Sequence, residues 1–429
     1  MDMKSDSDIR SISTSSIIED VTANHSLTID ISNLIVDDLN LKEIEKEWIK
    51  KYPGEEFVPD LIANCTTFNC KVRIEKQRIG YLSMKKATFK EDISFLSVTF
   101  TQEASFEKAK FKSNVNILLS TFERKATFSS ARFDKSVSFE KSAFNEIFTC
   151  NSATFQKAPS FVSVQFGGLV FFQHTKVIDP KGIFKLDLAK FESTVRIFDF
   201  KCYGISMNNA VNYSMMAFEK EGEENGSLQS MSLKNMINLG QININWDTRD
   251  VQQMIHNGSV DNHSKAAQFA LIKENYHIIG QYDWEDQAFL AHMRCRQKAA
   301  VEDHRYGLAF GYRLIDIIGR YGLNPARVAC TMLVTLITYV FIYLAFFFII
   351  SDKLVWTFLM DSIINSCFAF IGLGYSPLLV IPENYLLLCL IATESIIGYF
   401  LLSYFLVALV RRTVVSRIFR TLVRRLCCK

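Results

Sequence analysis

The sequence lacks the residue clusters on which enzymes and metalloproteins depend. Its seven histidines do not gather together, and its ten cysteines are scattered without the paired spacing of metal sites. It contains neither a P-loop nor a dinucleotide-binding glycine fingerprint. The formal net charge of +3 over 429 residues is too small to favour nucleic acid as a partner. We therefore expect a protein that is not an enzyme, with no cofactor, no metal site and no nucleic-acid partner.

Phenylalanine, in contrast, recurs at a regular interval in the first half of the chain. The series is Phe89, Phe95, Phe100, Phe106, Phe111, Phe122, Phe128, Phe133, Phe139, Phe144, Phe155, Phe161, Phe166 and Phe172. The steps alternate between six and five residues, and Ile117 and Cys150 occupy the two positions that phenylalanine misses. This interval fits neither the helical period of 3.6 nor the strand period of two. It predicts a solenoid in which each short side contributes one buried residue.

The residues around this series resemble a known repeat. A small or β-branched residue stands two positions before most of the phenylalanines, as in Ala87-Thr88-Phe89 and Ala126-Thr127-Phe128. These segments resemble the phenylalanine-rich branch of pentapeptide-repeat proteins. The resemblance implies a right-handed, four-sided β-helix with coils of about 22 residues, stacked at the roughly 4.8 Å spacing of paired strands. We expect this β-helix at residues 60–212, after an N-terminal region and cap at residues 1–59. The start of the chain, up to Thr22, is rich in Ser and Asp and has no apolar stretch like that of a signal peptide, so we expect it to be disordered.

Two segments in the second half are long and apolar enough to cross a bilayer. Val328 to Ile350 carries no charge, and Tyr385 to Val410 carries only Glu394. Basic residues flank the two segments at Arg313, Arg320, Arg327, Arg411, Arg412, Arg417, Arg420, Arg424, Arg425 and Lys429, whereas the connecting loop holds only Lys353. The positive-inside rule therefore predicts a two-span membrane protein with both termini in the cytoplasm, and we expect the inner membrane of a bacterium.

Helical patterns connect the predicted β-helix to the first span. A helical linker at 213–306 includes two segments with apolar residues at helical spacing, Ala266 to Gly280 and Trp284 to about Val301. Residues 307–322 follow as an amphipathic helix at the membrane surface, residues 323–412 form the membrane domain, and residues 413–429 form a basic cytoplasmic tail.

The loop between the spans carries the strongest indication of function. Trp356 to Phe370 is an apolar run of 15 residues, too short to cross the membrane but long enough to enter it and return. A Gly-x-Gly turn follows it. This order resembles the two-span channels of the potassium-channel superfamily. The resemblance implies a homotetramer whose selectivity filter consists of Phe370, Ile371, Gly372, Leu373, Gly374 and Tyr375, and a permeant monovalent cation, K⁺ or Na⁺.

The second span adds to this resemblance. Glu394 and Gly398 have the Glu-x-x-x-Gly spacing of the inner helix of prokaryotic inward rectifiers. The resemblance implies that Glu394 supports the filter through a hydrogen bond to Ser366 or Asn365, with Asp361 as a second supporting residue. A competing interpretation is that Glu394 lines a cavity and attracts cations, because ionisable groups inside a span tend to face protein or water.

The filter departs from that of selective potassium channels, which reads Thr-Val-Gly-Tyr-Gly-Asp. Aligned on the glycines, Phe370 replaces the Thr, Leu373 replaces the Tyr, and Tyr375 replaces the Asp. These changes remove a hydroxyl ligand and the hydrogen bonds that brace the filter. We expect a pore that distinguishes K⁺ from Na⁺ poorly or is closed by the Phe370 ring.

Three functions follow as hypotheses. The first is a tetrameric cation channel whose cytoplasmic β-helix acts as scaffold or sensor, with lipid, other copies of the chain, and a protein or ligand on the β-helix as partners. The second is a membrane-tethered interaction scaffold with a non-conducting pore-like domain. The third, a DNA mimic like some pentapeptide proteins, needs an acidic cylinder. Residues 87–200 hold 15 Lys and Arg against 12 Asp and Glu, a net charge of +3, which excludes it.

Overall fold

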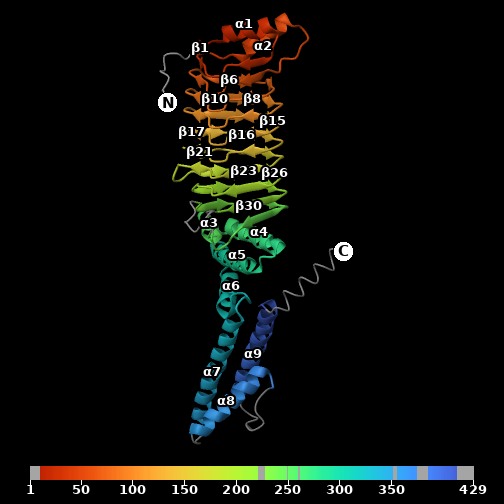
Figure 1. Ribbon diagram of the computed structural model, residues 1–429. Coiled ribbons are helices and arrows are strands. Elements are labelled where there is room, and N and C mark those ends of the chain that lie inside the picture. The colour runs from red at the N-terminus through yellow and green to blue at the C-terminus, as the bar shows by residue number, and fades with distance from the viewer. Residues whose placement is uncertain are drawn as a thin grey trace. The chain divides into compact units, whose positions relative to one another are not determined.

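The computed structural model describes residues 10–220, 228–248, 250–258, 261–350, 355–373 and 385–412. The chain divides into two compact units, Met1–Arg296 and Gln297–Lys429. The first unit is a β-solenoid of about ten turns, and the second consists of helices (Figure 1). The predicted fold class, a four-sided β-helix followed by helices that include two candidate membrane spans, is confirmed.

Parallel strands stack into four faces of the solenoid, here called faces A to D. Face A consists of β1 (Ser11–Ile12), β3 (Ile35–Val36), β5 (Thr67–Phe68), β9 (Thr88–Phe89), β13 (Lys110–Phe111), β17 (Arg132–Phe133), β21 (Thr154–Phe155) and β24 (Lys176–Val177). Face B consists of β2 (Thr28–Asp30), β4 (Asp60–Ile62), β8 (Leu82–Ser83), β12 (Ala104–Ser105), β16 (Ala126–Thr127), β20 (Phe148–Thr149), β23 (Val170–Gln173), β27 (Val195–Phe198), β30 (Met215–Glu219) and β33 (Gln241–Ile244).

The other two faces are built in the same way. Face C consists of β6 (Val72–Glu75), β10 (Ile93–Leu96), β14 (Val115–Leu118) and β18 (Val137–Ser138), then β25 (Ile183–Lys185), β28 (Gly204–Ser206) and β31 (Ser230–Ser232). Single bridges through Ser160 join its two parts. Face D consists of β7 (Arg78–Ile79), β11 (Thr99–Phe100), β15 (Thr121–Phe122), β19 (Ala143–Phe144), β22 (Gln165–Phe166), β26 (Lys190–Phe191), β29 (Val211–Asn212) and β32 (Ile237–Asn238).

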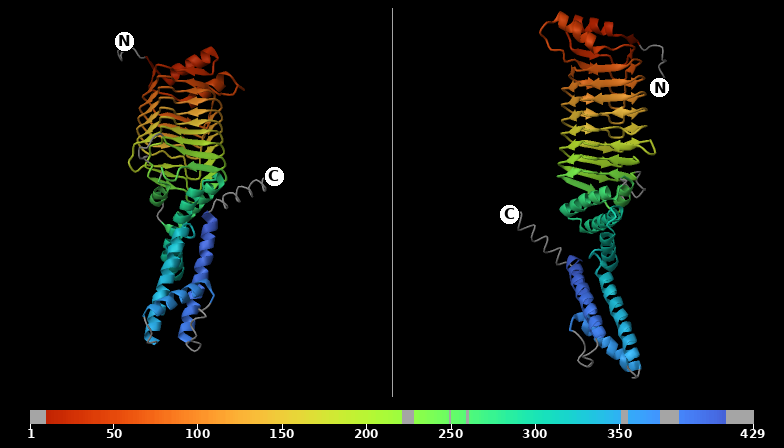
Figure 2. Two further views of the ribbon diagram at one scale, coloured as in Figure 1. Left: turned by 60° about the horizontal axis from the view of Figure 1, so that its bottom comes forward. Right: turned by 180° about the vertical axis from the view of Figure 1, so that it is seen from behind.

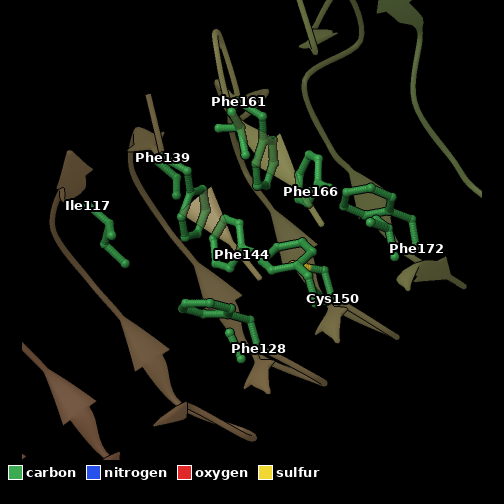
Figure 3. Packing of buried hydrophobic residues seen from close by; sticks show 14 of the residues in the cluster. Ile117, Phe128, Phe139, Phe144, Cys150, Phe161, Phe166 and Phe172 are labelled. Atoms are coloured by element: carbon green, nitrogen blue, oxygen red, sulfur yellow. The ribbon is translucent and has the colours of Figure 1, made fainter. Parts of the chain in front are cut away.

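The phenylalanines form stacked ladders inside the solenoid. On face A, Phe111 pairs in register with Phe89 and Phe133, and its ring centroid lies 5.0 Å and 4.6 Å from theirs with interplanar angles of 3°. Face D repeats this arrangement. Figure 3 shows two further rows with a step of 22 residues, one through Ile117, Phe139 and Phe161 and one through Phe128, Cys150 and Phe172. Each ring is thus buried between the coils on either side of it.

The gap that Cys150 leaves in the series is filled by the residue two positions before it. Phe148 is fully buried, and its ring centroid lies 4.4 Å from that of Phe144 and 5.8 Å from that of Phe172. A large side chain and a small one have exchanged places along this edge of the core. The core volume is therefore conserved although the spacing of phenylalanine is not.

The solenoid extends beyond the predicted range of 60–212 at both ends. Its early and late coils bury aliphatic and methionine side chains at many positions, among them Ile29, Val36, Met216, Met231 and Ile242. The structure also corrects the expectation of disorder up to Thr22 for the residues it describes there. Helix α1 (Thr14–Asn24) buries Ile17 and Val21, and with α2 (Leu41–Lys51) it joins the same hydrophobic core. Short amphipathic helices of this kind produce no phenylalanine periodicity, and the search for a repeat therefore misses them.

Three helices follow the last coil of the solenoid: α3 (Val251–Gly258), α4 (Asn262–Ile279) and α5 (Tyr282–Glu302). From α4, the Asn275 amide accepts a hydrogen bond from Ile242 N at 2.7 Å and donates one to Ile242 O at 2.7 Å. The Tyr276 hydroxyl donates to Ile244 O at 3.0 Å. These contacts satisfy backbone groups of β33, so α4 closes an edge that another chain could otherwise extend.

Left-handed backbone conformations mark every second corner of the regular coils. Positive φ recurs every eleven residues, at Lys86, Ser97, Lys108, Leu119, Ser130, Lys141, Ser152, Ser163 and His174. Leu119 has a φ of 53° and is 53% exposed, so a γ-branched side chain occupies a strained conformation without a compensating burial.

Leu119→Asn is therefore expected to stabilise the solenoid by about 0.5–1 kcal/mol, because asparagine tolerates this conformation. The measurement is the denaturation midpoint of the full chain, followed by far-UV circular dichroism. Leu169→Asn is the matched control, since Leu169 is 39% exposed and has no positive φ. A lower midpoint for Leu119→Asn would contradict the proposed corner geometry.

The second unit contains four helices among its described residues: α6 (Tyr306–Gly319), α7 (Pro325–Ile350), α8 (Val355–Ile371) and α9 (Tyr385–Arg412). Two of its segments, Pro325–Phe346 and Tyr385–Val410, are long and apolar enough to span a membrane. In both views of Figure 2, α7 and α9 run alongside each other and α8 lies against both. The predicted basic tail, 413–429, lies outside the described residues.

Candidate functional site

One carboxylate joins the three long helices of the second unit. Glu394, on α9, is fully buried. Its Oε2 accepts a hydrogen bond from the Tyr343 hydroxyl of α7 at 2.8 Å, and its Oε1 accepts one from Ser366 Oγ of α8 at 2.5 Å. We call these three residues the Glu394 triad. Tyr343 and Ser366 are also fully buried, so solvent does not compete for these bonds.

The triad explains how an acidic residue is accommodated inside an apolar helix. A buried carboxyl group without partners is costly, but here each oxygen has a hydroxyl donor from a different helix. Ser366 Oγ also lies 3.3 Å from Leu336 O of α7. Of the two predicted partners, Ser366 makes the contact, while Asn365 is buried one residue earlier. Loss of Glu394 would therefore leave the buried Tyr343 hydroxyl without its acceptor and Ser366 with only the longer contact to Leu336 O.

The C-terminus of α8 ends in a Schellman motif. Gly372 has a φ of +82°, its amide donates to Ala369 O at 2.9 Å, and the Leu373 amide donates to Phe368 O at 2.9 Å. Glycine adopts this left-handed conformation without steric cost. The first glycine of the predicted filter thus ends the helix.

One turn of α9 packs against this end of α8. Ser395 Oγ donates to Ala369 O at 2.8 Å, and the Tyr399 hydroxyl donates to Gly372 O at 3.4 Å. Gly398 lies between them, and a Cβ added there would be only 2.2 Å from Phe370 O. The absence of a side chain at 398 therefore allows α9 to approach the α8 backbone. There Ser395 adds a second hydrogen bond to Ala369 O, and Tyr399 supplies one to the Gly372 carbonyl just after the helix.

The side chains of the predicted filter point in different directions. Phe370 is buried and packs in a cluster with Ile318 of α6 and Leu401 of α9, whereas Ile371 is 57% exposed and Leu373 is 67% exposed. Gly374 and Tyr375 lie outside the described residues. Asp361 is half-buried on α8. Within one chain, the Phe370 ring is therefore part of a helix contact and does not stand free.

Sequence reasoning missed three residues of this site. Tyr343, Ser395 and Tyr399 all carry hydroxyls inside apolar helices, and each makes a hydrogen bond to another helix. Ser395 and Tyr399 lie close to Glu394 in sequence, so their polarity within a span was a usable signal. Tyr343 lies 51 residues away, and only the helix packing brings it to the triad.

The remaining reactive side chains have structural environments. Burial raises the pKa of the Cys150 thiol well above its usual value and that of Cys202 to about 11, so both stay protonated and pack in the core. Among the described residues, no group of three or more His, Cys, Asp and Glu side chains could hold a metal ion. A comparison of the chain with protein-family models, curated proteins and solved structures gives no match. The functional argument therefore depends on the geometry of the helices themselves.

Proposed function

We propose that the second unit is the pore domain of a homotetrameric cation channel and that the β-solenoid is its cytoplasmic scaffold or sensor. The observation that carries this proposal is the Glu394 triad, which fastens a 17-residue helix, α8, to both span helices. A helix of this length is too short to cross a bilayer, but it can enter and return when its ends are satisfied by protein. The contacts of Ser395 and Tyr399 supply such partners at its C-terminus.

Four chains are needed because one loop cannot surround an ion. In the proposed tetramer, the end of α8 at Gly372 would approach the axis, and the exposed Ile371 and Leu373 would meet other copies. The outer surfaces of α7 and α9, which expose apolar residues such as Phe341 and Ile396, would meet lipid or neighbouring subunits.

The orientation follows from the basic residues that flank the spans. The positive-inside rule supports cytoplasmic termini and thus a cytoplasmic solenoid. The two spans would lie in the inner membrane of a bacterium. Helix α6 supports this arrangement because it exposes Leu308, Phe310, Leu314 and Ile317, as a helix at a membrane surface would.

The packing of Phe370 modifies the expectation for selectivity. Because its ring is buried against Ile318 and Leu401, the proposed tetramer would not place it freely across the pore. The hydroxyl ligand of the potassium filter is still missing at this position. We therefore favour an open but poorly selective filter over one closed by Phe370.

The second candidate function is a membrane-tethered interaction scaffold with a non-conducting pore-like domain. One observation favours it: the conformation of Gly372 is fully explained by the Schellman motif, which needs no ion. Ion flux separates the two functions.

The test uses purified full-length protein reconstituted into liposomes and planar bilayers, with K⁺ on one side and Na⁺ on the other. We expect tetramers by native mass measurement and a cation current that reverses near zero millivolts, because the filter lacks the potassium ligands. An added ionophore confirms that the liposomes hold their gradient. Monomers or dimers in mild detergent, or tetramers without current, would favour the scaffold function.

A further inference from the structure

Face B of the solenoid carries a hollow that the channel proposal does not use. It has a volume of about 410 Å³ and opens on the outer side of β12, β16, β20 and β23. Its floor is a column of three hydroxyl side chains, Ser105, Thr127 and Thr149, and Phe171 lies at the end of this column. We call this hollow the face B trough. Its volume is in the range of small-molecule sites.

The repeat itself builds this column. Ser105, Thr127, Thr149 and Phe171 are direct partners in the parallel ladder, so they stand one above the other. The strand spacing places their side chains about 4.8 Å apart. A ligand with polar groups at a similar spacing can therefore contact several coils at once.

One floor hydroxyl has no hydrogen-bond partner. Ser105 is 1% exposed and its Oγ is unpartnered, whereas the hydroxyls of Thr127 and Thr149 are both within hydrogen-bond distance of Ser129 Oγ, at 3.1 Å and 3.2 Å. A buried hydroxyl without a partner destabilises the fold. If this residue were needed only for packing, alanine would give a more stable protein. A ligand that reaches Ser105 would supply the missing bond.

The long side chains around Ser105 can move to admit a ligand. Glu103 and Lys125 form an ion pair at 3.3 Å with side chains 40% and 45% exposed, and Glu107 pairs with Lys108 at 3.4 Å. Ion pairs at such exposure are weak. Their displacement therefore costs little.

The charges and the aromatic ring indicate the class of ligand. Two acidic side chains, Glu103 and Glu107, and two basic ones, Lys85 and Lys125, line the trough, so it has no net charge with which to select an ion. Hydroxyl, amide and carboxylate groups offer both donors and acceptors. The half-buried ring of Phe171 offers an apolar surface on which a sugar ring can stack.

We propose that the face B trough binds a neutral carbohydrate, with Ser105 and Thr127 as hydrogen-bonding residues and Phe171 as the stacking surface. Face A differs because the outward column that holds Thr88 and Thr154 also holds Lys110, Arg132 and Lys176, which project from the surface. The outward column of face C, Ser94, Asn116 and Ser138, contains no aromatic ring. The proposal does not depend on whether the second unit conducts ions.

Saturation-transfer NMR on the full-length protein in lipid nanodiscs tests the proposal, with maltose, cellobiose and trehalose as probes. Nanodiscs are needed because many detergents carry a sugar headgroup. We expect transfer to at least one disaccharide. The double variant Ser105→Ala/Thr127→Val should weaken that binding about tenfold or more, since two hydrogen bonds are lost.

Two controls separate binding from folding. Ser105→Ala alone is expected to keep or raise the thermal midpoint, because it removes an unpartnered hydroxyl. Thr121→Val removes a hydroxyl from the ladder of face D, outside the trough, and should leave binding within about twofold of wild type. Absence of transfer to all three sugars, unchanged binding by the double variant, or binding of glucose 6-phosphate in preference to the neutral sugars would overturn the proposal.

Discussion

Phe133→Ala is expected to reduce the free energy of unfolding of the solenoid by about 3–5 kcal/mol. Phe133 is fully buried, and its ring is stacked between those of Phe111 and Phe155, at centroid distances of 4.6 Å and 4.7 Å. Backbone hydrogen bonds to the coils on either side fix the spacing of the ladder. The coils cannot close around the missing ring, so most of its volume would remain as a cavity.

The measurement is chemical denaturation of the full-length protein followed by far-UV circular dichroism. Phe171→Ala is the matched control, because Phe171 lies half-buried on the outside of the same solenoid. Its loss is expected to cost about 1 kcal/mol or less. Equal midpoints for the two variants would show that the register of the face A ladder is wrong.

The sequence predicts the solenoid well where one residue type marks the coil. Each Phe from Phe89 to Phe172 in the series is buried, because each short side has one central inward position for a large side chain, beside a smaller buried residue two positions earlier. The prediction fails where other residues fill the same space. Phe148 replaces the expected ring at Cys150, and the outer coils use Ile29 or Met231 instead of phenylalanine. Core volume, which the fold conserves, is not visible as a single-letter period.

The corners of the coils and the outer column of face B could not be predicted from the sequence either. Residues as different as Lys86 and Leu119 occupy left-handed positions, so no glycine signals them in the sequence. The hydroxyls of Ser105 and Thr127 stand 22 residues apart, and only the ladder makes them neighbours. A periodicity search directed at buried residues does not detect a column on the outside.

In the second unit the sequence predicts the helices better than their contacts. An acidic residue inside a span indicates a buried partner, but it does not identify Tyr343 of another helix. Phe370 is a second example of a contact that the sequence does not predict. Alignment on the glycines assigns it a filter position, but nothing in the sequence indicates that its ring shares a buried cluster with Ile318 and Leu401. The identity of neighbours in a helical bundle depends on helix rotation, which apolar sequences specify weakly.

Gly398→Ala is expected to separate α8 from α9 and to abolish any ion current. The new Cβ would lie 2.2 Å from Phe370 O and 2.9 Å from its carbonyl carbon, so a backbone would have to move. Movement of α9 away from this contact would lengthen the bond between Ser395 and Ala369 and pull Glu394 away from Ser366. Overpacking of this kind typically costs roughly 1–3 kcal/mol.

Gly311→Ala on α6 is the matched control, because no atom lies within 4 Å of a Cβ added there. Both variants are compared by the thermal midpoint of the detergent-solubilised protein and by current in planar bilayers. We expect a lower midpoint and no current for Gly398→Ala, and wild-type behaviour for Gly311→Ala. The midpoint tests the helix contact even if the wild-type protein proves not to conduct. A Gly398→Ala protein that melts like wild type would refute the close approach of the two helices, whereas one that melts earlier yet conducts fully would refute the role of this contact in the pore.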